Sequence, residues 1–361
     1  MVTEVFFKNT SSLCPICREE IKAQLFQKEG GIMIAKECRL HGQFSALVDP
    51  DADLYRQAIS HRQKRGEIPF ATVIPVTQRC NLKCRWCYLP ERGSEPEIAA
   101  IKKIIERCQS KFIVFSGGEP TLSTDLFELI RYLKAKYSAK SAVLLTNGLK
   151  LADADYCREL KKAGLDYLVF SFNGFRPQTH QYFNHQDLLP LKLKALENIK
   201  RLKIWTILSM TLAKNVNEDE LSTVYQFSLN NLDFVRQIRL RNVSEIGIYQ
   251  KGKLLYLSDL IKIVSQASGI SLAEMSKNNA NFNRFNKTAN YFVLNIKMPY
   301  SKQNTSVVEK VNFRLEIFFW PTLLNIDLRQ CRLFNIDHLT NTGEILPFWE
   351  ALYQNEKKFV G

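Results

Sequence analysis

The sequence predicts an α/β protein in which helices cover a parallel β-sheet, with a small metal-binding module before the sheet and an α+β extension after it. Two observations lead to this fold class. From residue 70 onward, short apolar runs alternate with longer stretches of helical periodicity, which is typical of a parallel sheet. Before that point, three cysteines and a histidine occur as two closely spaced pairs. The 361 residues, of which 45% are hydrophobic, are enough for one large core with small attachments.

Residues 1–50 form the predicted metal-binding module. Cys14 and Cys17 make one pair of potential ligands, and Cys38 and His41 make a second pair after twenty intervening residues. These paired ligands suit a tetrahedral zinc site of the zinc-ribbon type, with a rubredoxin-like iron or free cysteines as the alternatives. Four protein ligands leave no open position, so we expect a structural metal. So small a module buries little apolar surface, and it would need such a crosslink to fold.

Residues 51–69 are expected to form a helical connector. Apolar residues four positions apart, such as Leu54 and Ala58, give an apolar face to an otherwise polar stretch that ends at Gly66 and Pro69. No Gly/Ser-rich linker separates the two modules, so we expect the small module to pack against the large one.

The large domain is expected over residues 70–245. Its strand candidates are the apolar runs 70–76, 112–116, 141–146, 166–172, 204–212 and 235–241. Helical periodicity separates them, at about 95–109, 123–137, 151–163, 189–202 and 218–230. In α/β barrels, ligands bind at the carboxyl ends of the strands. The residues that directly follow these strands are therefore the candidates for a functional site.

A loop with three cysteines follows the first of these strands. Cys80, Cys84 and Cys87 are close enough in sequence for three thiolates to point into one small volume. Three thiolates on a cluster of four irons leave one iron without a protein ligand, and that iron can bind a substrate or cofactor directly. Structural cysteines or a zinc site are the alternatives. Zinc would need a fourth ligand, and none stands nearby at zinc-ribbon spacing.

A glycine-rich loop, Gly117-Gly118-Glu119-Pro120, follows the second strand. Paired glycines let a backbone approach a ligand closely. A glutamate and exposed carbonyls can accept hydrogen bonds from an ammonium group. A simple turn before a helix is the alternative.

Together, the two loops resemble the signature of the radical S-adenosylmethionine superfamily, in which an aromatic residue such as Trp86 precedes the last cysteine. The resemblance implies a partial barrel of six β/α units and a 4Fe-4S cluster that binds S-adenosylmethionine. It also implies reductive cleavage of this cofactor to a 5'-deoxyadenosyl radical, which abstracts hydrogen from an unactivated carbon of the substrate. The glycine-rich loop would hold the amino group of the cofactor's methionine. A flavodoxin or ferredoxin would supply the electron.

Under this resemblance, polar residues at the ends of later strands are further candidates for cofactor binding. Asn147 follows the third strand, and Ser171 and Asn173 stand at the end of the fourth, where related enzymes often place a small polar pair against the ribose or carboxylate. Arg241 ends the sixth strand, after Arg239 on the same face. We expect Arg241 either to bind a carboxylate at the barrel mouth or to form a salt bridge at the rim.

The N-terminal module and the C-terminal tail resemble a subfamily that contains tetraether lipid synthases and a pterin methyltransferase. The tail segments that carry this likeness are Cys331-Arg332-Leu333, Asp337-His338-Leu339 and Thr342 to Trp349. Trp349 stands where such proteins often have a cysteine, and the chain lacks the cysteine sets of their auxiliary clusters. Methylation and carbon–carbon coupling are therefore both open as the reaction.

Residues 246–361 are expected to line the open side of the barrel and to determine the substrate. Phe318, Phe319 and Trp320 provide either an apolar wall for an acyl chain or part of the sheet core.

Two further cysteines and two further histidines lie outside these motifs. Cys108 and Cys157 lie within helical patterns without ligand partners, which favours buried structural cysteines. His180 and His185 follow the fourth strand, where they either face the substrate or lie in a surface loop, and we expect the surface loop.

The composition bears on partners and location. A net charge of +14 and a pI near 9.3 favour anionic partners: a phosphorylated small molecule, an anionic membrane surface or a lipid substrate. Solvated helix faces, with Lys192 among them, would also account for the charge. No dense basic run with interleaved aromatic residues is present, which disfavours nucleic acid. The alternative to an enzyme is a non-catalytic, zinc-containing protein that binds metal or nucleic acid.

The sequence has no apolar run of about 18 residues, so we expect no transmembrane segment. Nine cysteines, clustered by motif, indicate metal binding in a reducing cytosol rather than disulfides. We therefore expect a cytoplasmic protein, peripheral to the membrane if its partner is a lipid.

Overall fold

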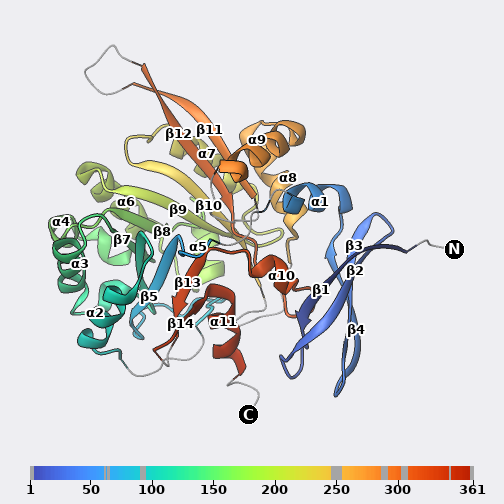
Figure 1. Ribbon diagram of the computed structural model, residues 1–361. Coiled ribbons are helices and arrows are strands. Elements are labelled where there is room, and N and C mark those ends of the chain that lie inside the picture. Colours follow the sequence, from blue (N-terminus) through green and yellow to red (C-terminus); the bar gives the residue numbers. More distant parts are fainter. Residues whose placement is uncertain are drawn as a thin grey trace.

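The computed structural model describes residues 4–60, 62, 66–89, 95–244, 254–285, 292–301, 308–340 and 343–357. Within these ranges, the chain forms a four-stranded sheet and a ten-stranded sheet. Figure 1 shows the four-stranded sheet at one side of the molecule, next to α1 (Ala52–Ser60) and α10 (Leu328–Cys331). None of the described helices combines the length and the hydropathy needed to cross a bilayer.

The N-terminal sheet is an antiparallel meander in chain order. Its strands are β1 (Val5–Leu13), β2 (Glu20–Lys28), β3 (Gly31–Cys38) and β4 (Gly42–Asp49). The turn after β1 carries Cys14 and Cys17, and the turn after β3 brings Cys38 and His41 to the same end of the sheet.

Buried polar contacts fasten this sheet to the C-terminal part of the chain. The Lys36 ammonium donates to the Ser12 hydroxyl at 3.1 Å and to the carbonyl oxygen of Leu13 at 2.7 Å. It also donates to the carbonyl oxygen of Leu323 at 2.7 Å. Ser12 in turn donates to the carbonyl oxygen of Ile326 at 2.7 Å. Burial lowers the pKa of Lys36 to about 8. The small module therefore packs against the large one, as expected.

The six strands expected in the large domain are present, and they lie side by side in parallel. They are β5 (Ala71–Thr77), β6 (Phe112–Gly117), β7 (Ser141–Thr146), β8 (Tyr167–Ser171), β9 (Trp205–Leu212) and β10 (Val235–Asn242). The sheet does not close on itself within the described residues, and it is a partial barrel.

C-terminal strands extend this sheet at both ends. β12 (Val308–Ile317) pairs in parallel with β10, and β11 (Phe292–Ser301) pairs antiparallel with β12. At the other end, β13 (Ile336–Leu339) pairs in parallel with β5, and β14 (Ile345–Pro347) pairs antiparallel with β13. The segment that follows the six expected strands thus contributes to the walls of the same barrel.

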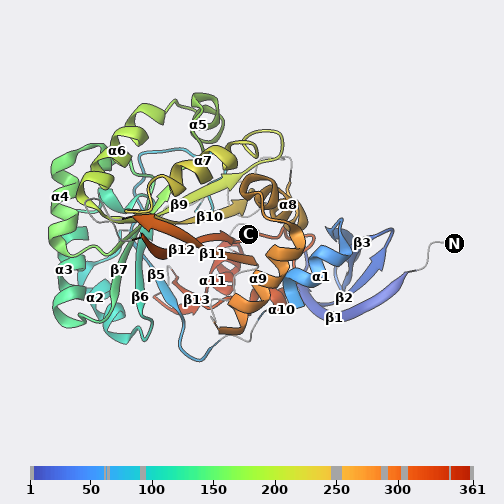
Figure 2. The ribbon, with the colours of Figure 1, turned by 90° about the horizontal axis from the view of Figure 1, so that it is seen from above.

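Helices follow most of the strands and cover the outside of the sheet (Figure 2). Those of the barrel are α2 (Ile98–Arg107), α3 (Leu126–Lys136), α4 (Ala154–Ala163), α5 (Pro177–Asn184), α6 (Leu189–Leu202) and α7 (Glu220–Leu229). Beyond them are α8 (Leu257–Ser268), α9 (Leu272–Phe285) and α11 (Phe348–Lys357), and the short 3-10 turns η1 (Pro120–Leu122) and η2 (Leu149–Ala152). The helix α5 lies where we expected a surface loop. Proline at its first turn is a helix-start signal that was present in the sequence.

The two faces of the large sheet have different surroundings. Alternate residues on the outer face pack against the helices in the main hydrophobic core, for example Ile74, Phe115 and Phe170. Their neighbours in the sequence point to the inner face, for example Val73, Val114 and Val169, and line a cavity. Cys108 and Cys157 belong to the core on the helical side, as expected.

Candidate active site

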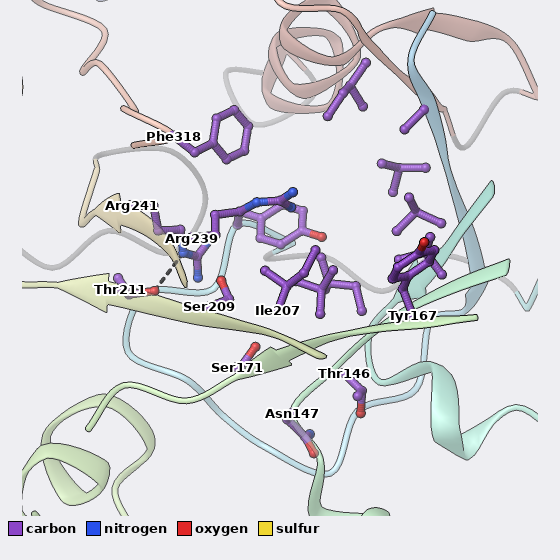
Figure 3. A pocket seen from close by; sticks show the side chains of 18 of the residues that line it. Thr146, Asn147, Tyr167, Ser171, Ile207, Ser209, Thr211, Arg239, Arg241 and Phe318 are labelled. Carbon is purple, nitrogen blue, oxygen red and sulfur yellow. Dashed lines mark hydrogen bonds between the residues drawn. The ribbon is translucent and has the colours of Figure 1, made fainter. Parts of the chain in front are cut away.

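The cavity enclosed by the partial barrel has a volume of about 860 Å³. Side chains from β5 to β10 and from β12 line it, together with the loops at the carboxyl ends of β5 and β6. Figure 3 shows that these side chains converge on one space from several strands. Because the strands are parallel, the loops that follow them all lie at one end of this space.

Cys80, Cys84 and Cys87 lie together at that end. All three line the cavity, and none of them forms a disulfide. Burial raises the pKa of Cys84, and the charges of Cys87 and Cys80 raise it further. Trp86 is buried beside Cys87 and also lines the cavity. Three thiols that face one enclosed space match the donor set of a 4Fe-4S cluster with one open iron position.

Helix α5 holds the cysteine loop in place. The backbone N–H of Arg85 donates to the carbonyl oxygen of Phe183 at 2.9 Å, and its guanidinium Nε donates to the carbonyl oxygen of Tyr182 at 2.9 Å. The side-chain amide of Asn184 donates to Cys84 Sγ at 3.1 Å. The cysteines are therefore positioned by a helix that lies about 100 residues later in the chain.

The glycine pair in the loop after β6 is required by contact with the cysteine loop. A Cβ atom on Gly117 would lie 2.2 Å from the carbonyl oxygen of Thr77, and one on Gly118 would lie 2.3 Å from the carbonyl oxygen of Arg79. The backbone N–H groups of Gly118 and Glu119 donate to these same carbonyl oxygens. The sequence predicts that these glycines admit a ligand. In the structure, the groups closest to them are backbone carbonyl oxygens of the same chain.

The Glu119 carboxylate links the ends of β6 and β7. It accepts hydrogen bonds from the Thr121 hydroxyl at 2.7 Å, from the Thr146 hydroxyl at 2.6 Å and from the backbone N–H of Asn147 at 2.7 Å. Gly117, Gly118 and Glu119 line the cavity. Pro120 begins η1, and it is not among the described residues that line the cavity.

Asn147, Ser171 and Asn173 also line the cavity, at the ends of β7 and β8. The Asn147 side-chain amide donates to the Asn81 side chain in the cysteine loop at 2.8 Å. The Asn173 side chain accepts from the backbone N–H of Thr211 at 2.9 Å, which ties the end of β8 to β9. The structure therefore brings all three residues to the same end of the barrel as the cysteines.

Lys192 is a cavity residue that the sequence analysis placed on a solvated helix face. Its side chain is buried, lines the cavity and donates to the carbonyl oxygen of Ser171. Burial lowers the pKa of Lys192 to about 8, and the charges of Cys84 and Glu119 oppose that effect. Lys192 thus places a cation near both the cysteine loop and the glycine-rich loop. Its position in a row of lysines along the sequence gave no sign of this.

The N-terminal ligands form a second, separate group. Cys14, Cys17, Cys38 and His41 have their ligand atoms within 4.8 Å of one another. The Sγ atoms of Cys17 and Cys38 are 3.8 Å apart, and His41 Nδ1 lies 3.4 Å from Cys38 Sγ. A tetrahedron with zinc–sulfur bonds of about 2.3 Å has edges of about 3.8 Å, so the site fits a zinc ion.

Comparison with known proteins agrees with this geometry. Residues 74–228 match the Radical SAM superfamily, and residues 6–50 match the HMPTM N-terminal zinc ribbon domain. This chain carries a radical S-adenosylmethionine domain. The fold class expected from the sequence is confirmed, and so is the resemblance that pointed to it.

Two curated relatives illustrate the range of similar proteins. The 7,8-dihydro-6-hydroxymethylpterin dimethyltransferase of Methanocaldococcus jannaschii is 31% identical over 304 residues, which are 74% of this chain and 60% of that protein. The GTP 3',8-cyclase of Listeria monocytogenes is 26% identical over 217 residues, which are 57% of this chain and 64% of that protein. The chain thus spans less than two thirds of the length of these relatives.

Among solved structures, SuiB of Streptococcus suis bound to S-adenosylmethionine superposes with a TM-score of 0.54 at 16% sequence identity. The match covers 78% of this chain and 60% of SuiB. At this identity, the likeness concerns the fold alone.

The cavity has an arginine-rich wall on the side of β10. Arg241 lines the cavity, and its Nε donates to the Thr211 hydroxyl at 2.7 Å. Its guanidinium lies 5.4 Å from the centre of the Trp320 ring. Arg239, two residues earlier, lies 3.7 Å from the Glu316 carboxylate. The sequence left open a salt bridge of Arg241 at the barrel rim. In the structure, Arg239 makes such a salt bridge, and it does so within the cavity wall.

Of the aromatic residues at 318–320, some line the cavity and one belongs to the core of the sheet, which are the two roles expected for them from the sequence. Phe318 and Trp320 line the cavity, whereas Phe319 belongs to the main hydrophobic core. Alternation along an extended segment explains the division, because neighbouring side chains point to opposite faces.

One histidine differs from its expected surface position. His180 is buried within α5, its ring nitrogen Nε2 lies 3.0 Å from the carbonyl oxygen of Gly174, and burial lowers its pKa to about 4. His185 ends α5 and is exposed, as expected. The expectation of a loop was wrong because α5 was missed.

Proposed function

We propose that this chain is a radical S-adenosylmethionine enzyme whose 4Fe-4S cluster is bound by Cys80, Cys84 and Cys87. One observation carries the proposal: the three cysteines and the loop Gly117 to Glu119 line the same end of one enclosed cavity. A cavity of about 860 Å³ can hold a cofactor and a small substrate together. The cavity favours an enzyme over the alternative, a protein that only binds metal or nucleic acid.

The cluster and S-adenosylmethionine supply reductive cleavage to a 5'-deoxyadenosyl radical that removes hydrogen from an unactivated carbon. The chain's own residues bind, orient and exclude water. Carbonyl groups of the glycine-rich loop and Glu119 would accept hydrogen bonds from the methionine ammonium group. Asn147, Ser171 and Asn173 would provide polar contacts to the ribose and carboxylate, and Trp86 would close the site beside the cluster.

Lys192 extends this set of cofactor contacts. Its ammonium group is the cation whose charge interacts with both Cys84 and Glu119. A cation in that place would offset the carboxylate of S-adenosylmethionine and part of the negative charge of a thiolate-bound cluster.

The substrate is proposed to be an organic anion or a lipid-like molecule. The net charge of +14 supports an anionic partner. The dimethyltransferase likeness supports methylation of a pterin-like ring as one candidate reaction, and carbon–carbon coupling is the other. A flavodoxin or ferredoxin would serve as the reductant. Nine cysteines, none of which forms a disulfide in the described residues, favour a reducing, cytoplasmic setting, with attachment at a membrane surface if the substrate is a lipid.

The N-terminal site is proposed to hold a structural zinc ion, with iron as the alternative. Four protein ligands leave no position for a substrate. The role would be to fold the sheet β1–β4 and present it to the C-terminal segment.

Anaerobic reconstitution tests the enzymatic proposal. The reconstituted protein should contain about four irons per chain at the cysteine loop, as a cluster of that type requires. On reduction with dithionite, it should consume S-adenosylmethionine and release 5'-deoxyadenosine. A protein that takes up iron and zinc but never consumes the cofactor would be a binding protein, and the proposal would be wrong.

A further inference from the structure

One wall of the cavity is rich in arginine. Arg239 and Arg241 lie on the inner face of β10, and Arg314 lies on the neighbouring strand β12. Figure 3 shows Arg239 and Arg241 extending into the cavity, close to Phe318. The only carboxylate that this wall contributes to the lining, among the residues the structure describes, is Glu316.

Arg241 has a fixed position but no carboxylate partner among the described residues. Its Nε donates to the neutral Thr211 hydroxyl, and its guanidinium lies against Trp320. Burial lowers the pKa of Arg241, which means that the charged form is poorly solvated there. A guanidinium has five N–H donors, and Thr211 accepts only one of them. This side chain is therefore prepared to bind an anion from the cavity.

Arg239 and Arg314 share a single negative charge. Glu316 is 4% exposed, and it lies 3.7 Å from Arg239 and 3.8 Å from Arg314. Among the described residues, one carboxylate thus lies near both guanidiniums in a partly dry wall, where charge interactions are strong. With Arg241 and Arg236, the described residues that line the cavity from β10 and β12 include four arginines and one carboxylate.

S-adenosylmethionine accounts for only one end of this wall. The charges of Cys84 and Cys87 act on Arg241, so Arg241 lies at the end of the wall that is nearest the cysteine loop. The glycine-rich loop that we propose for its methionine group follows β6, and three strands separate β6 from β10 in the sheet. A different cation, Lys192, already lies near Glu119 and Cys84. Arg239 lies two residues earlier on β10, farther from the carboxyl end of the strand, so the wall extends from the cysteine loop into a part of the cavity that is available to a second ligand.

The other walls describe the rest of that ligand. The strands β6 to β9 contribute apolar side chains to the cavity, including Val114, Leu145 and Ile207. Phe318 and Phe348 also line the cavity, and both rings contact Trp320, against which the Arg241 guanidinium lies. A ligand that fits these surroundings has an anionic group at one end and an apolar or ring-shaped body at the other.

We propose that Arg241 and Arg239 form the anion-binding subsite of the substrate, and that they hold a phosphate or carboxylate group while its apolar or ring body lies against β6 to β9. Arg241 is expected from the sequence among the cofactor-binding candidates, and in this proposal it faces the substrate's anionic group from the end of the wall nearest the cysteine loop. This inference rests on the proposed function for the reaction that follows, but binding of the anion is independent of that reaction.

The test measures binding to the cluster-loaded protein in the presence of S-adenosylmethionine, by titration calorimetry in a buffer without phosphate. Phenyl phosphate is the soluble probe, phenol is its neutral counterpart, and dihexanoyl phosphatidic acid represents a lipid headgroup. Arg241→Gln should weaken binding of the anionic probe at least about tenfold, the usual effect of losing a charge-assisted hydrogen bond. Arg131→Gln, on the exposed face of α3, is the matched control and should bind as the wild type does.

A second variant removes the concern that one substitution disturbs the fold. Arg239→Gln combined with Glu316→Gln removes one cation and one anion, and it leaves no buried carboxylate with a single partner. It should also weaken phenyl phosphate binding, with an unchanged melting temperature. Tighter binding of phosphatidic acid than of phenyl phosphate would indicate a lipid, and the reverse would indicate a soluble phosphate ester or carboxylate.

Two results would overturn the inference: no detectable binding of either anionic probe, or equal affinity in wild type, Arg241→Gln and Arg131→Gln. Formation of 5'-deoxyadenosine in the same preparations keeps this outcome separate from the proposed function. If the wild type forms it but binds no anion, only the subsite is wrong. If it forms none, the proposed function itself has failed.

Discussion

The side-chain amide of Asn184 donates a hydrogen bond to Cys84 Sγ at 3.1 Å, and this contact joins the end of α5 to the cysteine loop. Asn184 is buried, and the neighbouring residues Tyr182 and Phe183 accept the hydrogen bonds that anchor Arg85. Hydrogen bonds to a sulfur ligand stabilise the reduced, more negatively charged state of an iron–sulfur cluster.

Replacing Asn184 should therefore lower the reduction potential of the cluster. A hydrogen bond that favours the reduced state by about 1 kcal/mol corresponds to about 40 mV for one electron. Asn184→Leu should show a downward shift of this order in an electrochemical titration of the reconstituted protein. Gln181→Leu, an exposed amide on the same helix, is the control and should leave the potential unchanged. An unchanged potential in Asn184→Leu would show that the contact only positions the loop.

Substitution of Gly117 should destabilise the protein and weaken cofactor binding. Its φ of 123° is rare for residues with a side chain, and an added Cβ would lie 2.2 Å from a backbone oxygen. We expect Gly117→Ala to lower the free energy of unfolding by more than about 2 kcal/mol. Gly269→Ala is a matched control, since Gly269 also has a positive φ but nothing within 4 Å of the added atom. It should cost only about 1 kcal/mol. Equal losses in the two variants would remove the steric explanation.

Stability should fall as the solution becomes acidic, in part because of His338. This histidine is buried, and burial lowers its pKa to about 4, against about 6.5 for an unfolded chain. Between pH 6.5 and 4, the unfolded chain binds a proton that the folded chain does not, so acid favours unfolding. The contribution reaches about 3 kcal/mol at pH 4.

Denaturant unfolding at several pH values measures this effect. His338→Gln should lose less stability than the wild type between pH 6.5 and 4, and His185→Gln, at an exposed position, should behave like the wild type. Parallel curves for the wild type and His338→Gln would show that this histidine does not contribute.

Removal of the N-terminal metal should lower the free energy of unfolding, and it should leave the iron–sulfur cluster in place. Cys38→Ser should lose one zinc (or iron) per chain and at least about 2 kcal/mol of unfolding free energy, as expected for loss of a metal crosslink. The iron of the cysteine loop should stay bound. Arg39→Ser, in the same turn and exposed, is the control. Loss of activity in a Cys38→Ser protein that remains fully folded, with its cluster, would point to a catalytic role for the site.

The parts of the fold that could be predicted are those that leave a pattern within a short segment of the sequence. The six strands are apolar runs separated by amphipathic helices, and both cysteine motifs depend only on short spacings. Pairings between distant segments leave no such signal, which is why the addition of β12 to β10 and of β13 to β5 could not be foreseen.

The candidate site shows the same division. Local motifs identified the cysteines and the glycine-rich loop. Burial of a charged residue is set by tertiary packing, so Lys192 looked the same as its solvated neighbours. The steric need for glycine at positions 117 and 118 could not be predicted either, because the carbonyl oxygens that an added Cβ would meet belong to another loop.

The measurement that tests the central claim most directly is 5'-deoxyadenosine formation by Cys84→Ala. The wild type and the variant would be reconstituted anaerobically with iron and sulfide, reduced with dithionite and supplied with S-adenosylmethionine. We expect the variant to lose the iron–sulfur absorbance and all cofactor cleavage, while the N-terminal metal stays bound and the protein stays folded. A Cys84→Ala protein that keeps a full cluster and forms 5'-deoxyadenosine at the wild-type rate would contradict the account.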